Sequence, residues 1–457
     1  MEREKLSSRL GFILISAGCA IGIGNVWKFP YMVGQNGGGI FVLIYLLFLL
    51  ILGVPALSVE FTLGRAAKKS PAKLYQALEK PGQKWHIHGY AAVAANYLLM
   101  MFYTVVSGWM IHYLVLTAGG RFEGLNPVEV EGVFDTVCAD PVTMVLYMGI
   151  AVVLGFLVCG FGVQNGLERV SKIMMSALLI IMVVLAVNSA SLPGGQEGLM
   201  FYLKPDLGKL QERGIINVVL AAMNQAFFTL SIGIGSMAIF GSYIGRERSI
   251  LGESVTVSLL DTFVALMSGV IIFPACSAFG VKADAGPKLL FVVLPNIFNN
   301  MPFGRVWGSL FFVFMTFAAM STVFAVFENL ISCSMEIFNI SRRKSCIINC
   351  VVMFALSLPC ALGFNLLGGF KPFGGDTTVL NLEDFLVSNI LLPLGALVYI
   401  LFCVSKNGFG WNKFVEEANQ GKGLKIHKWM KWHYKIVLPV IIIVVFLMGL
   451  ITFNYAQ

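Results

Sequence analysis

Charged residues are scarce in this sequence. Asp, Glu, Lys and Arg together make up 12% of the 457 residues, whereas about a quarter of the residues in soluble domains are charged. Hydrophobic residues reach 57%. So little charge excludes an ordinary soluble domain and favours an all-α integral membrane protein, for which the lipid bilayer is the solvent.

Several residue patterns that carry chemistry are also missing. The nine cysteines form no CxxC pair and have no histidine at metal-binding spacing, so packed and reduced thiols are expected. No apolar segment combines a nucleophile with a histidine partner, and no Walker lysine follows the glycines at residues 22–24. An enzyme is therefore not expected. The net charge of +8 is assigned to loops that face anionic lipid headgroups, not to a nucleic-acid surface.

Long apolar runs recur along the whole chain. A run of about twenty residues can cross a hydrocarbon core about 30 Å thick. Eleven transmembrane helices are predicted, at residues 10–34, 39–64, 87–118, 142–160, 167–190, 215–241, 250–274, 304–338, 345–366, 380–404 and 436–454.

Basic residues are unevenly distributed between the connecting loops. If the N-terminus is cytoplasmic, 23 of the 32 Lys and Arg residues lie on the cytoplasmic side, seven of them between residues 406 and 435. The loop at residues 119–141, on the opposite side, is acidic. The positive-inside rule therefore favours a cytoplasmic N-terminus. The expected location is the cell's inner (plasma) membrane. After eleven spans, the C-terminus would lie outside.

Two of the predicted spans contain a break. The first carries Gly18, Gly22 and Gly24 next to Asn25, and its tetrapeptide Ile-Gly-Ile-Gly recurs in the sixth span at residues 232–235. Glycine-interrupted segments at corresponding places in two halves of a chain indicate a binding site at the interface of the halves. Close helix packing through small residues is the simpler alternative.

The spacing of the two breaks suggests an inverted repeat. Each break begins a set of five helices, and because five is odd, the two sets enter the membrane from opposite sides. We therefore predict a first repeat in residues 1–190 and a second, inverted repeat in residues 191–405. A cytoplasmic basic loop and an eleventh helix would occupy residues 406–457.

Three carboxylates stand out inside predicted spans, where a charge costs roughly 3 kcal/mol even on lenient insertion scales. For Glu60 and Glu328 we expect a structural role, in which the carboxylate binds free amides of unwound backbone. Asp261 is different, because Asn25 and Thr229 supply further oxygen donors from spans that would meet at the breaks. Oxygen ligands suit a hard cation, so these three residues predict a sodium site.

A second sodium site is predicted in the eighth span. Ser321 and Thr322 place two adjacent hydroxyls one turn after Ala318. With backbone carbonyls they would coordinate a cation without using a charged group. The alternative is that both hydroxyls bond back to carbonyls of their own helix.

Four motifs resemble the signatures of one family. They are GIGNVWKFPY at 22–31 and NGGG at 36–39 in the first span, EFTLGR at 60–65, and FFTLSIG at 227–233. Together they resemble the neurotransmitter:sodium symporters, from about residue 3 to residue 454. The resemblance implies a five-plus-five inverted repeat with discontinuous helices 1 and 6, in the eleven-helix bacterial branch of the family.

The resemblance also implies ligands for two sodium ions and a substrate. The first sodium site would use Ala20, Asn25, Thr229 and Asp261. The second would use Gly18, Ile21, Ala318, Ser321 and Thr322. The substrate would contact Ala20, Gly22, Gly24, Leu99, Tyr103, Phe228, Ser231, Ile234, Thr322 and Val326. An outer gate would pair Lys28 with Asp384 beneath a Phe228 lid, and an inner gate would pair Arg3 with Glu336.

Departures from the family pattern narrow the substrate. Gly22 stands where amine-transporting members have an aspartate, so the substrate should bring its own carboxylate, which would bind the Tyr103 hydroxyl. Asp261 and Ala265 stand where chloride-dependent members have Asn and Ser, which predicts chloride-independent transport. At the outer gate Lys28 replaces the usual arginine, and a point contact instead of a bidentate one predicts weaker closure.

The predicted function is sodium-coupled symport. Two sodium ions would drive the import of one neutral amino acid, aromatic or large aliphatic with tyrosine as the first candidate, by alternating access. A proton-coupled amino acid carrier of the same fold, with Asp261 carrying the proton, is one alternative. A channel or sensor that binds an amino acid without moving it is another. The oligomeric state is not predicted.

Overall fold

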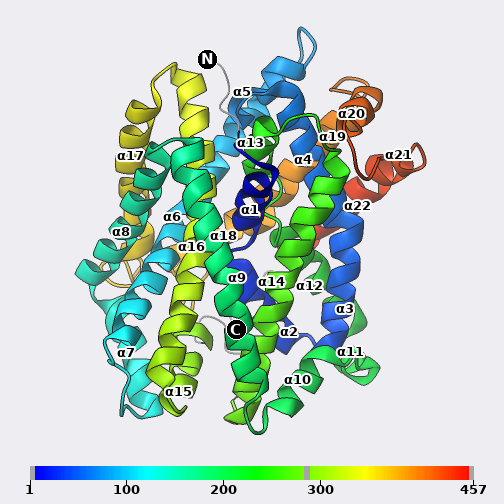
Figure 1. The fold of residues 1–457 in the computed structure, drawn as a ribbon. Coiled ribbons are helices and arrows are strands. Elements are labelled where there is room, and N and C mark those ends of the chain that lie inside the picture. Colours follow the sequence, from blue (N-terminus) through cyan, green and yellow to red (C-terminus); the bar gives the residue numbers. More distant parts are fainter. Residues whose placement is uncertain (1–5, 282–288, 452–457) are drawn as a thin grey trace.

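The computed structural model describes residues 6–281 and 289–451, which form a bundle of helices (Figure 1). In this part of the chain, nine helical segments are long and apolar enough to cross a membrane. They are Gly39–Ala67, His86–Ala118, Pro141–Gly160, Val163–Ala190, Ile250–Ala278, Gly304–Phe338, Arg342–Leu362, Val379–Val404 and Met430–Ile451.

The two remaining predicted spans are interrupted. The first consists of α1 (Arg9–Ala20) and a second segment, Gly24–Gln35, that is bent from it by 57°. The sixth is divided into α12 (Ile215–Phe228) and α13 (Ser236–Tyr243), each too short to cross a membrane alone. Helices thus occur in all eleven predicted segments, the last described to Ile451, and the two predicted breaks are present.

Shorter elements complete the described chain. The uninterrupted spans are α6 (His86–Ala118), α8 (Pro141–Gly160), α14 (Ile250–Ala278), α16 (Gly304–Phe338) and α17 (Arg342–Leu362). The remaining α-helices are α2 (Phe29–Gln35), α3 (Gly39–Phe48), α4 (Val54–Ala67), α5 (Pro71–Leu78), α7 (Pro127–Ala139), α9 (Arg169–Ala190), α10 (Gly195–Leu203), α11 (Leu207–Arg213), α15 (Leu294–Asn299), α18 (Val379–Phe385), α19 (Leu392–Val404), α20 (Trp411–Ala418), α21 (Met430–Trp432) and α22 (Leu438–Ile451).

Six π-helical turns widen the helices, and five of them have the same cause. In each of the five, a proline is the second residue of the α-helix that follows; proline lacks an amide hydrogen and its ring collides with the carbonyl four residues earlier. The five turns are η1 (Gly24–Lys28), η2 (Leu49–Gly53), η4 (Leu289–Val293), η5 (Leu386–Leu391) and η6 (His433–Val437). The sixth, η3 (Val163–Glu168), instead follows Gly162, which has a φ of +92°.

The interrupted helices lie at the centre of the bundle. α1 packs against α9, α13, α14 and α16, and α13 packs mainly against α4. Figure 1 shows α1 near the centre of the molecule and α13 above it, towards α5. The two breaks are therefore side by side and shielded from the outer surface.

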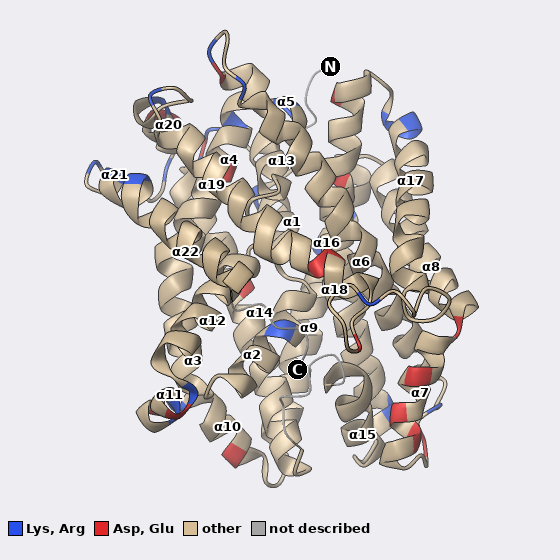
Figure 2. Ribbon diagram, turned by 180° about the vertical axis from the view of Figure 1, so that it is seen from behind, with Lys and Arg blue, Asp and Glu red and all other residues tan. Residues whose placement is uncertain are grey.

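The two ends of the bundle differ in charge. In Figure 2, Lys and Arg gather around α5, α20 and α21, whereas Asp and Glu are prominent on α7 and α10 at the opposite end. This asymmetry is the one from which the cytoplasmic N-terminus was predicted.

Candidate functional site

The break in the first span is held open by side chains. After α1, Ile21 has extended dihedral angles (φ −68°, ψ 102°). The Gly22 amide then donates to Asn25 Oδ1 at 3.1 Å, and the Ile23 amide donates to the Tyr103 hydroxyl at 3.1 Å. Because these amides have lost their helical partners, the two side chains replace the missing acceptors.

The break in the sixth span depends on left-handed backbone. Ser231, Gly233 and Gly235 have φ values of +50°, +111° and +78°. A Cβ on Gly233 would lie 2.1 Å from the Leu392 carbonyl oxygen, so only glycine fits there. The Gly233 amide donates to Glu60 Oε1 at 2.5 Å.

Glu60 is fully buried and binds the unwound backbone in the way that the sequence predicts for it. Replacing Glu60 with Ala leaves the buried Gly233 amide without this acceptor, which destabilises the fold by about 1–3 kcal/mol. We expect a lower melting temperature in detergent, measured by fluorescence-detected unfolding. Glu60→Gln keeps an oxygen acceptor, so its melting temperature should lie between those of Glu60→Ala and the unmodified protein. Equal melting of Glu60→Ala and the unmodified protein would contradict this role.

Glu328 binds side chains instead. It accepts from the Tyr243 hydroxyl at 2.6 Å and from Arg342 Nη1 at 3.2 Å, with a second contact to Arg342 Nη2. The sequence-based expectation that Glu328 binds free backbone amides therefore does not describe its contacts. It joins α13, α16 and α17 through side chains.

The residues predicted for the first sodium site come together. Asn25 Nδ2 lies 3.0 Å from Thr229 Oγ1 and 2.7 Å from Asp261 Oδ1, and Thr229 Oγ1 lies 3.1 Å from Asp261 Oδ2. Asp261 is fully buried. The Asn25 amide nitrogen faces the carboxylate and the hydroxyl, while its oxygen accepts from Gly22. A buried carboxylate with a hydroxyl and an amide beside it has the chemistry that suits a hard cation such as sodium.

The five residues predicted for the second sodium site also converge. The Ser321 hydroxyl lies 2.9 Å from the Ala318 carbonyl and 3.3 Å from that of Ile21. The Thr322 hydroxyl lies 3.3 Å from the carbonyls of both Gly18 and Ile21. Three carbonyls and two hydroxyls, all uncharged, thus connect α16 to the end of α1. Ser321 also bonds back to its own helix, whereas these Thr322 contacts go to carbonyls of the first span.

A small cavity lies between the two breaks. Eight of the residues predicted to contact a substrate line it: Ala20, Gly22, Gly24, Leu99, Tyr103, Phe228, Ser231 and Thr322. Thr229 and Leu392 line it as well. The other two predicted residues, Ile234 and Val326, are fully buried and are not among the lining residues.

The predicted outer gate lies beside this cavity. Lys28 Nζ is 3.8 Å from the centre of the Phe228 ring, a cation–π contact between the predicted gate cation and the predicted lid. Asp384, its predicted partner, accepts from the Ser388 hydroxyl at 2.7 Å. At the predicted inner gate, Glu336 accepts from the amide and hydroxyl of Ser70 at 2.9 and 2.7 Å. Arg3 lies outside the described residues.

Sequence reasoning missed two supports of the first break. The Ser268 hydroxyl donates to the Asn25 carbonyl at 2.8 Å, and Gln225 Nε2 lies 3.4 Å from the Gly24 carbonyl. Ser268 follows Asp261 by seven residues, two helical turns on the same face, and this spacing was a usable signal. Gln225 offered none beyond being a polar residue in an apolar helix.

Glu168 is a third residue that the sequence did not single out. It accepts from the Ser7 amide at 2.8 Å, the Ser7 hydroxyl at 2.5 Å and the Ser8 hydroxyl at 3.2 Å, and it pairs with Lys172 at 2.7 Å. A Cβ on Gly11 would lie 2.0 Å from Glu168 Oε1, so Gly11 lets α1 pass close to the carboxylate in this position. Glu168 thereby fixes the start of α1 to the fifth span.

Replacing Glu168 with Ala should loosen this end of α1. Hydrogen bonds to charged groups contribute about 1.5–3 kcal/mol. In the Glu168→Ala variant, the fraction of molecules with α1 released should therefore be roughly tenfold larger than in the unmodified protein. Cys19, fully buried in α1, should then react faster with a membrane-permeant maleimide. Cys19→Ser in the same background identifies the labelled thiol, and Glu212→Ala on the surface is the control. Unchanged labelling of Cys19 would show that Glu168 does not hold the helix.

The chain is similar to known transporters along its length. Residues 3–121 and 136–457 match the model of the sodium:neurotransmitter symporter family. An uncharacterized sodium-dependent transporter of Bacillus subtilis is 35% identical over 451 residues, 98% of each chain. Another, of Methanocaldococcus jannaschii, is 32% identical over 97% of this chain and 89% of the relative. The crystal structure of MhsT in complex with L-phenylalanine is similar with a TM-score of 0.87 and 34% identity, covering 98% of this chain and 100% of that one.

A helical membrane bundle with two interrupted spans, whose breaks adjoin hard oxygen donors, defines a secondary transporter and not an enzyme. This chain belongs to the sodium:neurotransmitter symporter family. It is a multi-span membrane protein of a family of sodium-dependent transporters, and its fold is that of MhsT. The family and fold predicted from the sequence are confirmed.

Proposed function

We propose that this protein imports a neutral amino acid with a large apolar or aromatic side chain, coupled to two sodium ions and independent of chloride. The observation that carries the proposal is the position of Asp261. Its carboxylate, Asn25 and Thr229 adjoin a cavity lined by unwound backbone and the Tyr103 hydroxyl. One ion and the carboxylate of an amino acid can therefore share this place.

The cavity supports an amino acid as substrate. Backbone groups of the two breaks and the Tyr103 hydroxyl provide partners for an ammonium and a carboxylate, while Leu99, Phe228 and Leu392 provide apolar walls. Gly22 leaves no side chain that could pair with an amine lacking a carboxylate. The similar structure, MhsT, is in complex with L-phenylalanine. This supports an aromatic substrate for the present protein, with tyrosine as our first candidate.

Alternating access would complete the transport cycle. Two sodium ions and a zwitterion bind from outside, the bundle that includes the first and sixth spans tilts, and the cytoplasmic end of α1 opens inward. Each sodium ion that moves through 100 mV contributes about 2.3 kcal/mol, and a tenfold gradient adds about 1.4 kcal/mol. Two ions supply roughly 7 kcal/mol, enough to concentrate a neutral solute about 10⁵-fold.

Asp261 is also the basis for the proposed chloride independence. A fixed carboxylate supplies the negative charge that a bound chloride would otherwise provide next to the sodium ion. The chain would lie in the plasma membrane with its N-terminus in the cytoplasm and its C-terminus outside. Sodium would then bind from the outer side of the membrane, where α7 and α10 would lie.

Uptake by the purified protein in liposomes tests the proposal. Radiolabelled tyrosine, phenylalanine and leucine should accumulate above equilibration only with an inward sodium gradient, and equally well when gluconate replaces chloride. Uptake that continues in choline but follows a pH gradient would favour the proton-coupled alternative. Saturable binding without accumulation would favour a sensor or channel. Preference for glycine or alanine over all three solutes would overturn the proposed substrate class.

A further inference from the structure

The basic segment between the tenth and eleventh spans is folded against the bundle. The rings of Trp411 and Phe414 on α20 pack against Tyr434, with centroids 5.6 and 5.4 Å away. The Tyr434 hydroxyl contacts Ser58 of α4 at 2.8 Å. Asn419 closes the intervening loop through two hydrogen bonds to the backbone of Ile426. Residues 411–434 are therefore a docked element and not the simple loop that composition predicts.

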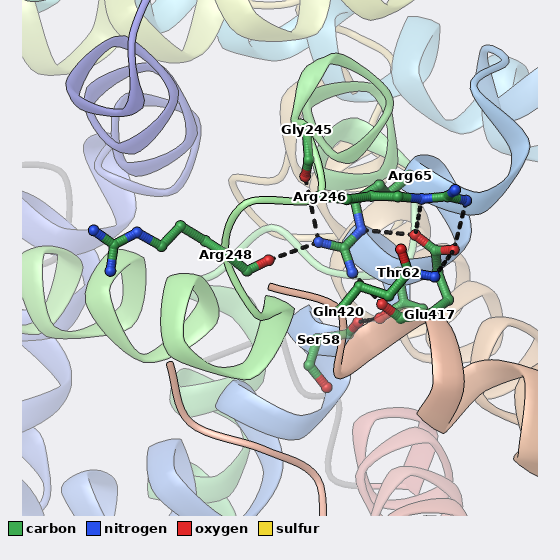
Figure 3. Close-up of polar contacts among 8 residues, drawn as sticks. All are labelled: Ser58, Thr62, Arg65, Gly245, Arg246, Arg248, Glu417 and Gln420. Carbon is green, nitrogen blue, oxygen red and sulfur yellow. Dashed lines mark hydrogen bonds and ion pairs between the residues drawn. The ribbon is translucent and has the colours of Figure 1, made fainter. Parts of the chain in front are cut away.

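A buried ion cluster attaches α20 to α4, as Figure 3 shows. Glu417 accepts from Arg65 Nε at 2.8 Å, and its backbone carbonyl accepts from Arg65 Nη2. The Arg65 side chain is fully buried, and its Nη1 also donates to the Arg248 carbonyl at 2.8 Å. Arg246 Nη2 binds the other oxygen of Glu417 at 2.8 Å. One carboxylate thus joins the end of α4 to the link between α13 and α14.

The same link is bound through its backbone to the loop that follows α20. Arg248 and Lys422 form a parallel β-bridge. The Ser249 amide donates to the Lys422 carbonyl at 3.0 Å, and the Lys422 amide donates to the Glu247 carbonyl at 2.9 Å. A displacement of residues 411–428 would therefore move the segment that directly follows the broken sixth span.

The outer face of this element combines tryptophan with lysine. Trp429 and Trp432 are 74% and 63% exposed, although they begin the eleventh apolar span. Lys428, Lys431 and Lys435 are exposed as well. Lys428 lies in the turn before α21, Lys431 in α21, and Lys435 in the π-helical turn that follows. From Ala418 to the last residue the sequence contains no Asp or Glu. This stretch of sequence therefore contributes only cationic charge to the face.

We propose that residues 428–435 bind the headgroups of anionic phospholipids in the leaflet that they face. Tryptophan prefers the headgroup level of a membrane, and lysines next to a span are attracted to anionic lipid. The depth of the segment, directly at the start of an apolar span, selects a bilayer over a soluble anion or an acidic protein. Contacts through Glu417 connect the lipid-binding face to Arg65 and Arg246, and so to the helices whose rearrangement transport requires.

Native mass spectrometry of the detergent-solubilised full chain tests lipid binding without requiring transport. We expect retained phosphatidylglycerol, little phosphatidylcholine, and about tenfold less phosphatidylglycerol on the triple variant K428Q/K431Q/K435Q. A matched variant, K84Q/K406Q/K413Q, removes three exposed lysines from the same end of the protein and should retain the lipid. Equal retention by both variants, equal binding of the two lipids, or full displacement by soluble glycerol phosphate would each overturn the proposal.

The connection to transport is tested separately, and this step rests on the proposed function. In liposomes containing about 30 mol% phosphatidylglycerol, uptake should be about threefold faster than in phosphatidylcholine alone. R246Q removes a half-exposed member of the cluster and leaves Glu417 paired with Arg65. It should bind the lipid normally but lose the lipid dependence of uptake. Lipid dependence that persists in R246Q would overturn the connection, whereas an absence of any uptake would contradict the proposed function and leave the binding result standing.

Discussion

Replacing Asp261 with Asn is expected to lower sodium affinity by two to three orders of magnitude. The carboxylate is fully buried and touches both other side-chain donors of its cluster, Asn25 and Thr229. Two unit charges 4 Å apart attract by about 4 kcal/mol at an effective dielectric constant of 20, which corresponds to roughly 1,000-fold in affinity. Asparagine has the same shape and still accepts a hydrogen bond, so the charge is the principal change.

The measurement is the sodium dependence of substrate binding, by scintillation proximity on purified protein. Asp135→Asn, an exposed acid on α7, is the control and should bind like the unmodified protein. If Asp261→Asn kept its sodium dependence within about twofold, Asp261 could not be a sodium ligand. If Asp261→Asn bound sodium only when chloride was present, the carboxylate would be confirmed as the group that makes chloride unnecessary.

Hydropathy and glycine spacing together predicted the membrane bundle and the two interrupted spans. Apolar runs of sufficient length are necessary for crossing a bilayer, so their number and limits survive folding with small shifts. The break at Gly233 could be predicted because its backbone conformation, with φ at +111°, is open mainly to glycine. Both the apolar runs and the glycines of the breaks are properties of the local sequence, so they could be predicted from it.

The lining of the cavity was predicted less completely, because a broken helix loses its period. Ile234 lies between Gly233 and Gly235, both with positive φ, so its direction cannot be read from helical spacing. Leu392 entered the lining from the tenth span, directly after the π-helical turn Leu386–Leu391. The proline at position 393 marks such a turn, but which side chain then reaches the cavity depends on tertiary packing.

Contacts between segments far apart in the chain could not be predicted from the sequence. Glu168 lies within the predicted fifth span, and its importance depends on Ser7 and Ser8, about 160 residues away. The partnership of Arg65 with Glu417 joins positions 352 residues apart. Both carboxylates have ordinary local surroundings in the sequence, and only the fold shows which cation or amide each one meets.

Replacing Gly22 with Ala is expected to abolish substrate binding while the protein still folds. A Cβ at this position would lie 2.4 Å from the Tyr103 hydroxyl and 2.8 Å from Thr322 Oγ1, inside the cavity lining. Both atoms belong to side chains at the proposed substrate and ion sites, so the methyl group displaces binding groups while the backbone core is untouched. We expect at least a hundredfold loss of affinity for the amino acid, since misplacement by about 1 Å costs that much at preorganised sites.

A double variant separates a steric cause from general damage. In Gly22→Ala/Tyr103→Phe the closest colliding atom is gone, and the next atom of that ring, Cζ, lies at an ordinary 3.6 Å from the new Cβ. The double variant should therefore bind no more weakly than Gly22→Ala alone, although Tyr103→Phe by itself weakens binding of the carboxylate. Gly132→Ala, where a Cβ meets nothing within 4 Å, should bind normally and controls for the substitution itself. If Gly22→Ala bound the amino acid within about twofold of the unmodified protein, the substrate would have to lie elsewhere. The proposed site needs the space next to the Gly22 backbone that a Cβ would fill.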